Sequence, residues 1–174
     1  MSLADQIKQR IKEVPDFPKP GISFKDITPL FLEPSLYPQM IEALAQPFEN
    51  QSVDYVVGIE SRGFLLGPGL AQKLNAGFIM LRKKGKLPRS TRSVSYDLEY
   101  GSAELEIHRE DIKANGNVLV HDDLLATGGT AAAAAQLIRE FNCTLTGFSF
   151  IAELNFLNGR EALRPHQIHS LVNY

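Results

Sequence analysis

The chain has few of the features that mark secreted, membrane or nucleic-acid-binding proteins. Its 174 residues include one cysteine, which excludes an internal disulfide and a cysteine-based zinc cluster. No apolar run approaches the roughly 20 residues that span a bilayer, and the first residues lack the basic and apolar regions of a signal peptide. The net charge of −2 gives no electrostatic argument for a nucleic-acid or membrane partner. We therefore expect a cytoplasmic protein with small-molecule partners.

Apolar strands alternate with amphipathic helices along the chain, which is typical of an α/β protein. Strands are predicted over residues 53–59, 77–81, 118–120, 144–154 and 168–172, and helices over 3–14 and 35–50 and directly after residues 63 and 130. The stripe predicted to face the core in the second helix is Leu36, Met40, Leu44 and Phe48. The sequence has no internal repeat or low-complexity segment, so residues 1–174 are expected to form a single domain.

The most informative stretch is a predicted strand followed by two acids, a glycine turn and a helix. Val118–Val120 are apolar at successive positions, which indicates a strand buried on both faces of a parallel sheet. Asp122 and Asp123 come at its carboxyl end, and the Thr-Gly-Gly-Thr of Thr127–Thr130 leads into an alanine-rich helix. In open α/β sheets the ligand crevice lies beyond the carboxyl ends of the strands. This stretch is therefore predicted to line the binding site.

The chemistry of this turn points to a phosphorylated sugar. Glycine permits a tight turn that aims several backbone N–H groups at one point, and a helix N-terminus adds about half a positive charge. Thr127 and Thr130 add hydroxyl donors for a phosphate dianion. Asp122 and Asp123 would repel that phosphate, but one sugar length away they can accept hydrogen bonds from ribose hydroxyls. We predict a ribose 5-phosphate site.

Other interpretations of the same residues explain less. A Walker phosphate loop needs a lysine after its last glycine, whereas Gly129 is followed by Thr130. The dinucleotide fingerprint needs three spaced glycines before the acid. An ordinary strand-to-helix turn, with acids present by chance, stays open on this stretch alone.

The stretch resembles the phosphoribosyl pyrophosphate (PRPP) motif of the type I phosphoribosyltransferases. The shared pattern is an apolar strand, two acids, two apolar residues and Ala-Thr-Gly-Gly-Thr. The resemblance implies a Rossmann-like central sheet, mostly parallel and flanked by helices, with an N-terminal hood and a β-ribbon lid. The PRPP-binding residues that it implies are Asp122, Asp123, Ala126, Thr127, Gly128, Gly129 and Thr130. His121 stands where the family usually has an aliphatic residue, and we assign it no catalytic role.

The N-terminal segment resembles the hood of adenine phosphoribosyltransferases. Apolar residues at helical spacing predict a helix over 3–14 that stops at the first proline. Three prolines and a glycine over 15–21 exclude regular structure, and composition alone favours a surface loop. The Phe-Pro-Lys-Pro-Gly motif and the later Phe-Lys-Asp-Ile-Thr are similar to the hood, which we expect over residues 1–35. The resemblance implies that Phe24 stacks on a purine beside Lys25, which replaces the commoner arginine.

Two further segments are predicted to bind anions. Glu60–Arg62 follows the strand over 53–59, and an arginine beside a helix start suits an anion, although a plain surface charge is as good an alternative. These residues resemble the pyrophosphate loop of the adenine-specific enzymes, which implies a cis peptide before Ser61. Arg82–Arg89 is the most basic stretch, and by itself it is typical of a solvated face. The residues that the resemblance assigns to this part of the substrate are Glu60, Ser61, Arg62, Arg82, Lys83 and Lys86.

Residues 93–108 alternate polar and apolar on both sides of a Tyr-Gly pair, which predicts a two-stranded ribbon. Such a ribbon suits a lid that excludes water from the reaction. It resembles the flexible loop of the same enzymes, and we expect the lid over residues 90–108. The resemblance implies that Glu99 exchanges a proton with the base and that Tyr100 contacts the substrate. From the residues alone, an ordinary exposed carboxylate is the favoured interpretation of Glu99.

These motifs occur in family order along nearly the whole chain, and together they imply a reaction. The resemblance implies transfer of the phosphoribosyl group of PRPP to adenine, giving AMP and pyrophosphate in purine salvage, with Glu99, Asp123 and Arg62 as catalytic residues. Mg²⁺ is the expected cofactor, held mainly by PRPP and pyrophosphate oxygens and water, without direct protein ligands. The family also implies a homodimer. A phosphoribosyltransferase for another base, and a regulator that senses PRPP without catalysis, stay open.

Overall fold

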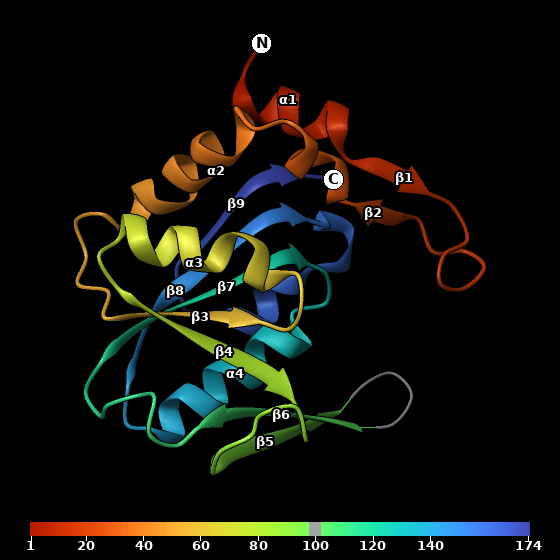
Figure 1. Ribbon diagram of the computed structural model, residues 1–174. Helices are drawn as coiled ribbons and strands as arrows, with labels where there is room; N and C mark the ends of the chain where they lie inside the picture. The colour runs from red at the N-terminus through yellow and green to blue at the C-terminus, as the bar shows by residue number, and fades with distance from the viewer. Residues whose placement is uncertain (98–101) are drawn as a thin grey trace.

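The computed structural model describes residues 1–97 and 102–174, which form a seven-stranded sheet with helices on both faces and a separate two-stranded pair (Figure 1). The strand order of the large sheet is β5-β6-β4-β3-β7-β8-β9. The α-helices are α1 (Leu3–Arg10), α2 (Leu36–Ala45), α3 (Gly63–Lys73) and α4 (Gly129–Glu140). The strands are β1 (Lys12–Val14), β2 (Phe24–Asp26), β3 (Tyr55–Ile59), β4 (Gly77–Lys83), β5 (Thr91–Asp97), β6 (Ser102–His108), β7 (Asn117–Leu125), β8 (Thr144–Glu153) and β9 (Ile168–Asn173).

Most neighbouring strands of the large sheet are parallel. β3 pairs in parallel with β4 and β7, and β8 pairs in parallel with β7 and β9. The α/β fold with a mostly parallel sheet is therefore confirmed. The ribbon predicted over residues 93–108 is present as the antiparallel pair β5–β6. Its second strand also pairs with β4, so the base of the ribbon is part of the main sheet.

Helices cover the sheet on both faces, with α2 and α3 on one side and α4 on the other (Figure 1). Leu36, Met40, Leu44 and Phe48 are fully buried between α2 and the sheet, which confirms the predicted stripe. Beneath α4, the stacked rings of Phe148 and Phe150 fill the second core. Within the described residues, none of the helices has the length and apolarity needed to cross a membrane.

Two predicted helices are shorter than expected. The first ends at Arg10 instead of Val14, because Lys12–Val14 pairs with Phe24–Asp26 as the antiparallel strands β1 and β2. Here a tertiary pairing overrides helical periodicity. The second helix ends at Ala45 and continues only as a short 3₁₀ turn, since the proline at position 47 lacks the N–H that an α-helix requires.

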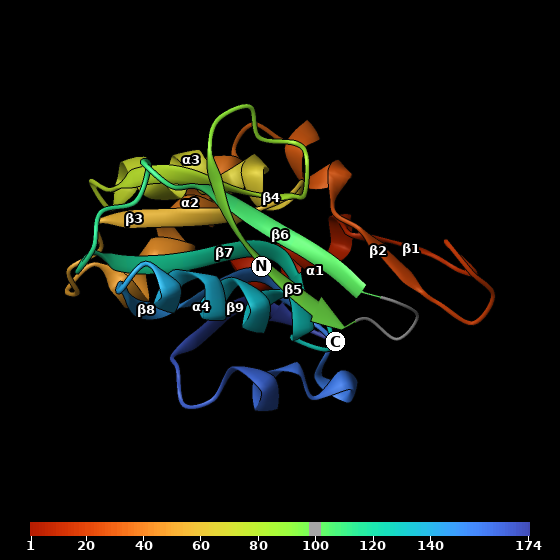
Figure 2. The same ribbon diagram turned by 90° about the horizontal axis from the view of Figure 1, so that it is seen from below.

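The parallel strands carry their following loops to one edge of the sheet. In Figure 1 the arrowheads of β3, β4 and β7 all point toward the same side, and the β1–β2 pair extends on that side as well. Figure 2, turned by 90°, shows the same grouping. This edge brings together the segments that follow β3, β4 and β7.

Candidate functional site

Three cavities lie at this edge, and the sequence-predicted residues line them. A cavity of about 220 Å³ lies against the loop between β7 and α4, with Arg62 and the acidic pair at its wall. A second, of about 280 Å³, is lined by Glu60, Ser61, Arg62, Lys83, Asp122 and Asp123. A third, of about 1010 Å³, opens under the β1–β2 pair, and we call it the hood cavity. The first two share Arg62 and both aspartates, so they form one continuous polar site.

The loop between β7 and α4 has the geometry of a phosphate cradle. Gly128 has a φ of +84°, a left-handed conformation that favours glycine, and α4 begins at the next residue. A Cβ at Gly128 would lie 2.5 Å from the Gly159 carbonyl oxygen, so a side chain is excluded there. Among the described residues no side chain caps the start of α4, which leaves its first N–H groups directed at the cavity for an anion.

The acidic pair lies within the last residues of β7, because the strand continues to Leu125 and does not end before the acids as predicted. Asp123 is 3% exposed, and its Oδ2 lies 2.6 Å from Arg62 Nε in an ion pair without hydrogen-bond alignment. Asp122 Oδ1 accepts a hydrogen bond from the Asp123 N–H at 2.9 Å. The two carboxylates are thus neighbours, and the Arg62 guanidinium is the cation paired with Asp123.

Burial raises the pKa of both carboxyls, and the neighbouring Asp123 charge raises the pKa of Asp122 further. The Arg62 guanidinium opposes these effects at both groups. Two crowded acids with one counter-ion leave a negative site that hydrogen-bond donors or a cation would stabilise. Ribose hydroxyls supply such donors. Next to the pair, His121 is fully buried, and burial lowers its pKa to about 4, so it is neutral at pH 7.

The loop after β3 contains the cis peptide between Glu60 and Ser61 that the family resemblance implied. The Glu60 carboxylate accepts two hydrogen bonds from Arg82, at 3.1 and 3.2 Å, and one from the Lys83 N–H at 3.0 Å. The hydrogen bonds from Arg82 lower the pKa of Glu60. The sequence placed both residues at the substrate, but here their charged groups bind each other. This pair ties the loop after β3 to the end of β4.

Arg62 connects the polar site to Phe24 of β2. Its guanidinium carbon lies 5.1 Å from the centroid of the Phe24 ring, while its Nε is ion-paired with Asp123. Phe17 contacts the same ring edge-to-face at 5.2 Å. The hood cavity presents Phe24 together with Tyr96, Leu124, Phe156, Leu157 and Tyr174. A flat aromatic ring in a largely apolar cavity suits a purine base.

The remaining predicted residues have mixed placements. Lys25 lines the hood cavity, but its ammonium group pairs with Glu13 and lies 4.3 Å from the centre of the Tyr174 ring. Lys83 lines the second cavity, and Lys86 is exposed on the loop after β4. Glu99 and Tyr100 lie outside the described residues.

Sequence reasoning missed part of the hood cavity. Phe156 and Tyr174 line it, although they lie at the far end of the chain from Phe24. Phe156 is 70% exposed, and only its place in the lining of this cavity, which the sequence pattern does not reveal, singles it out. Tyr96 was also missed, and its hydroxyl lies 3.4 Å from Thr130 Oγ1, which links β5 to the phosphate cradle.

Comparisons with known proteins agree with this geometry. Residues 32–159 match the family described as phosphoribosyl transferase domain. An adenine phosphoribosyltransferase of Acaryochloris marina is 53% identical over 168 residues, which are 97% of this chain and 99% of the relative. The adenine phosphoribosyltransferase structure from Rhodothermus marinus aligns with a TM-score of 0.94 at 47% identity, covering 99% of this chain and 98% of that one.

A second solved relative is described with ligands. The Saccharomyces cerevisiae adenine phosphoribosyltransferase, complexed with adenine and an imino-altritol bisphosphate, aligns with a TM-score of 0.91 at 42% identity, covering 97% of this chain and 98% of that one. Identity near one half over almost the full length of such relatives is far above what a shared fold alone requires. The chain therefore belongs to the adenine phosphoribosyltransferase family.

Proposed function

We propose that this enzyme transfers the 5-phosphoribosyl group of PRPP to adenine, forming AMP and releasing pyrophosphate. The observation that carries the proposal is the continuity of three subsites at one sheet edge. They are the uncapped start of α4, the Asp122–Asp123 pair with Asp123 ion-paired to Arg62, and the hood cavity beside Phe24. The complex of the yeast relative with adenine supports the choice of base.

The phosphate and the ribose are the best-defined parts of the proposed substrate pose. The loop Ala126–Thr130 would bind the 5-phosphate through backbone N–H groups and threonine hydroxyls. Asp122 and Asp123 would accept hydrogen bonds from the ribose hydroxyls, and Asp123 would offset positive charge at the sugar as the bond to pyrophosphate breaks. Fixing both ends of the ribose phosphate presents the anomeric carbon to the attacking nitrogen of the base.

The leaving group would bind in the second cavity. Breaking the bond to the anomeric carbon leaves negative charge on pyrophosphate, which a positive environment stabilises. Arg62, Lys83 and Ser61 line this cavity, and Arg82 is bound to Glu60, which also lines it. Lys86 completes the basic group from the loop after β4.

The base would stack on Phe24, inside a hood that we propose for residues 1–35 of one domain over 1–174. Residues 90–108 would act as its lid. Glu99 and Tyr100 belong to this lid in the proposal, and Glu99 would exchange a proton with the purine. Such proton transfer accelerates a reaction by a factor of about 10²–10⁴. The support for these two residues is their position in the family motif, since the structure does not describe them.

Mg²⁺ suits this site as an ion bound mainly to the substrate. Within residues 1–97 and 102–174, no three His, Cys, Asp or Glu side chains gather as a metal-binding group. Asp122 and Asp123 offer carboxylate oxygens beside the anion cavities, and they would hold the ion through its water molecules. When bound, Mg²⁺ would neutralise charge on pyrophosphate.

We also propose that the protein forms a homodimer, which the family and the exposed apolar side chains of Leu65 and Met80 support. We further propose a cytoplasmic location, which the phosphorylated substrates support.

The deciding experiment is a turnover assay with radiolabelled adenine, PRPP and Mg²⁺, in which labelled AMP should form. Competition with hypoxanthine, guanine, xanthine and orotate measures the preference for the base, and adenine should dominate. Preference for another of these bases would reassign the substrate. Binding of PRPP without any product would identify a sensor instead of an enzyme.

A further inference from the structure

The loop between β4 and β5 has to cross β6, because β6 lies between these two strands in the sheet. One face of β6 is closed to it, since Leu105 and Ile107 are buried in the core under α4. Residues 84–90 therefore run over the opposite face, and we call them the crossover loop. This loop carries Lys86.

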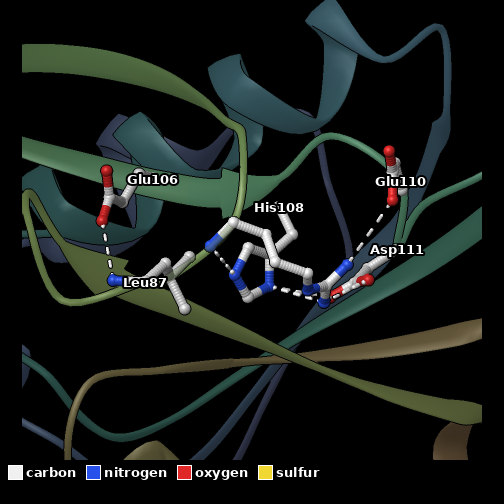
Figure 3. Close-up of polar contacts among 6 residues, drawn as sticks. Leu87, Glu106, His108, Glu110 and Asp111 are labelled. Atoms are coloured by element: carbon white, nitrogen blue, oxygen red, sulfur yellow. Dashed lines mark hydrogen bonds and ion pairs between the residues drawn. The ribbon is translucent and has the colours of Figure 1, made fainter.

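The opposite face of β6 holds the crossover loop through buried polar side chains. Glu106 is 5% exposed, and its Oε1 accepts hydrogen bonds from the N–H groups of Lys86 at 3.2 Å and Leu87 at 3.1 Å. Its Oε2 accepts a hydrogen bond from Thr91 Oγ1 at 3.2 Å. Figure 3 shows the Glu106 carboxylate directed at Leu87. A carboxylate is costly to bury, and these donors offset that cost.

His108 repeats this arrangement two residues along the same face. It is 6% exposed, and its Nε2 accepts a hydrogen bond from the Arg89 N–H at 3.3 Å. The hydrogen on Nδ1 is then donated to Asp111 Oδ2 at 3.0 Å (Figure 3). The Arg89 guanidinium binds both oxygens of Asp111, at 2.7 and 2.8 Å. Glu106 and His108 thus hold three backbone N–H groups of one loop.

Lys86 is also held from the other side. Its carbonyl oxygen accepts a hydrogen bond from Arg82 Nη1 at 3.2 Å, and Arg82 is bound to Glu60 in the loop after β3. The peptide groups on both sides of Lys86 are therefore fixed, one by Glu106 and one by Arg82. The charge of Lys86 also helps to lower the pKa of Glu60, so it lies within electrostatic reach of the second cavity. Its side chain itself stays exposed and available to a ligand.

We propose that Glu106 is a positioning residue for the leaving-group subsite: it fixes the backbone of the crossover loop so that Lys86 faces pyrophosphate. His108 supports the same loop three residues further on. This inference rests on the proposed function, in which Lys86 binds that group. Glu106 is not among the residues that line the three cavities, so in this proposal its effect passes through Lys86.

The first test compares Glu106→Gln with the matched variant Glu104→Gln. Glu104 lies two residues away on the same face of β6, but it binds the side chains of Lys84 and Ser93 instead of the loop N–H groups. Glu106→Gln should raise the KM for PRPP about 10-fold while the KM for adenine changes less than about 2-fold, because a charged acceptor is lost only on the pyrophosphate side. Glu104→Gln should change neither constant more than about 2-fold.

A double-mutant cycle with Lys86→Ala separates positioning from general loosening of the fold. If Glu106 acts through Lys86, adding Glu106→Gln to Lys86→Ala should raise the KM for PRPP no further. Additive effects, or equal changes in both KM values together with a lower Tm, would overturn the inference. If Glu106→Gln does not fold, His108→Leu should give a smaller shift of the same kind, and no shift would overturn the inference as well.

The same cycle distinguishes this inference from the proposed function. If Lys86→Ala leaves the KM for PRPP unchanged, Lys86 does not bind pyrophosphate, and both statements about it fail. If Lys86→Ala raises that KM and Glu106→Gln does not, only the positioning role fails. Product formation from adenine and PRPP in the unmodified enzyme tests the overall reaction independently of either variant.

Discussion

The proposed ribose-phosphate end and the proposed pyrophosphate end of the site are built in different ways. One contiguous stretch, from Asp122 to the start of α4, supplies the acidic pair and the phosphate cradle. The pyrophosphate end is assembled from the loop after β3, the crossover loop and the face of β6, which ion pairs and hydrogen bonds hold together. The first end depends on backbone shape and the second on side-chain pairs. Substitutions should therefore affect the two ends in different ways.

The largest effect is expected at the ribose. Asp122→Asn combined with Asp123→Asn should lower turnover about 10³-fold or more, because it removes the negative charge beside the anomeric carbon. The fold should survive, since burial already disfavours both charged carboxyls and amides remove that cost at pH 7. Initial rates measure the first effect and thermal unfolding the second. Near-normal turnover would refute the ribose assignment.

The proposed lid provides a third region, and substitutions in it can be compared with those at both ends of the site. Glu99→Gln should lower turnover about 10²-fold, because proton transfer to or from the base is lost in the transition state. The affinity for PRPP should change little. Glu110→Gln is the control. Glu110 is an exposed glutamate that follows β6, and its carboxylate makes a long ion pair of 3.9 Å with Arg89. An unchanged rate in Glu99→Gln would remove Glu99 from the mechanism.

Backbone shape at the cradle can be tested with two adjacent glycines. Gly128→Ala should destabilise the protein by about 1–3 kcal/mol, because φ is positive and the new Cβ would meet the Gly159 carbonyl. It should also weaken PRPP binding. Gly129→Ala should leave the free energy of unfolding within about 1 kcal/mol, since its Cβ would meet only Thr127 Oγ1 at 3.9 Å. Chemical denaturation of both variants measures this contrast, and equal stabilities would contradict it.

The smallest effect is expected in the way that falling pH changes the contribution of each end to the stability of the fold. Glu60 has a lowered pKa, so its pairing with Arg82 stabilises the fold above the pKa of the unfolded carboxyl and is lost as the pH falls through the folded value. Arg82→Leu should therefore cost about 1 kcal/mol or less at pH 7, and this cost should shrink as the pH falls through the lowered pKa of Glu60.

The acidic pair should show the opposite sign. Asp122 has a raised pKa, so the folded protein takes up its proton before the unfolded chain does, and its contribution to stability improves as the pH falls. Asp122→Asn should therefore be more stable than the unmodified protein at pH 7, with a gap that narrows toward pH 4. Thermal unfolding between pH 3 and 7 measures both variants. A gap that widens in acid would contradict the raised pKa.

Sequence patterns determined the parts of this protein that neighbouring residues build. The strand, acids, glycines and helix of residues 118–140 interact within one stretch, so their spacing was enough to predict the order of strand, glycine turn and helix and the fold class. The buried stripe of α2 was predictable for the same reason, since helical period decides which side chains share a face.

Only the tertiary structure decided the features that join distant segments. Glu60 binds Arg82 because parallel strands β3 and β4 end together, and Glu106 meets the crossover loop because β6 lies between β4 and β5. Lys12–Val14 became a strand because Phe24–Asp26 lies beside it. Tyr174 lines the hood cavity together with Phe24, although the two residues lie near opposite ends of the chain. Such contacts depend on strand order and register, which are decided by packing of the whole sheet and leave no local pattern in the chain.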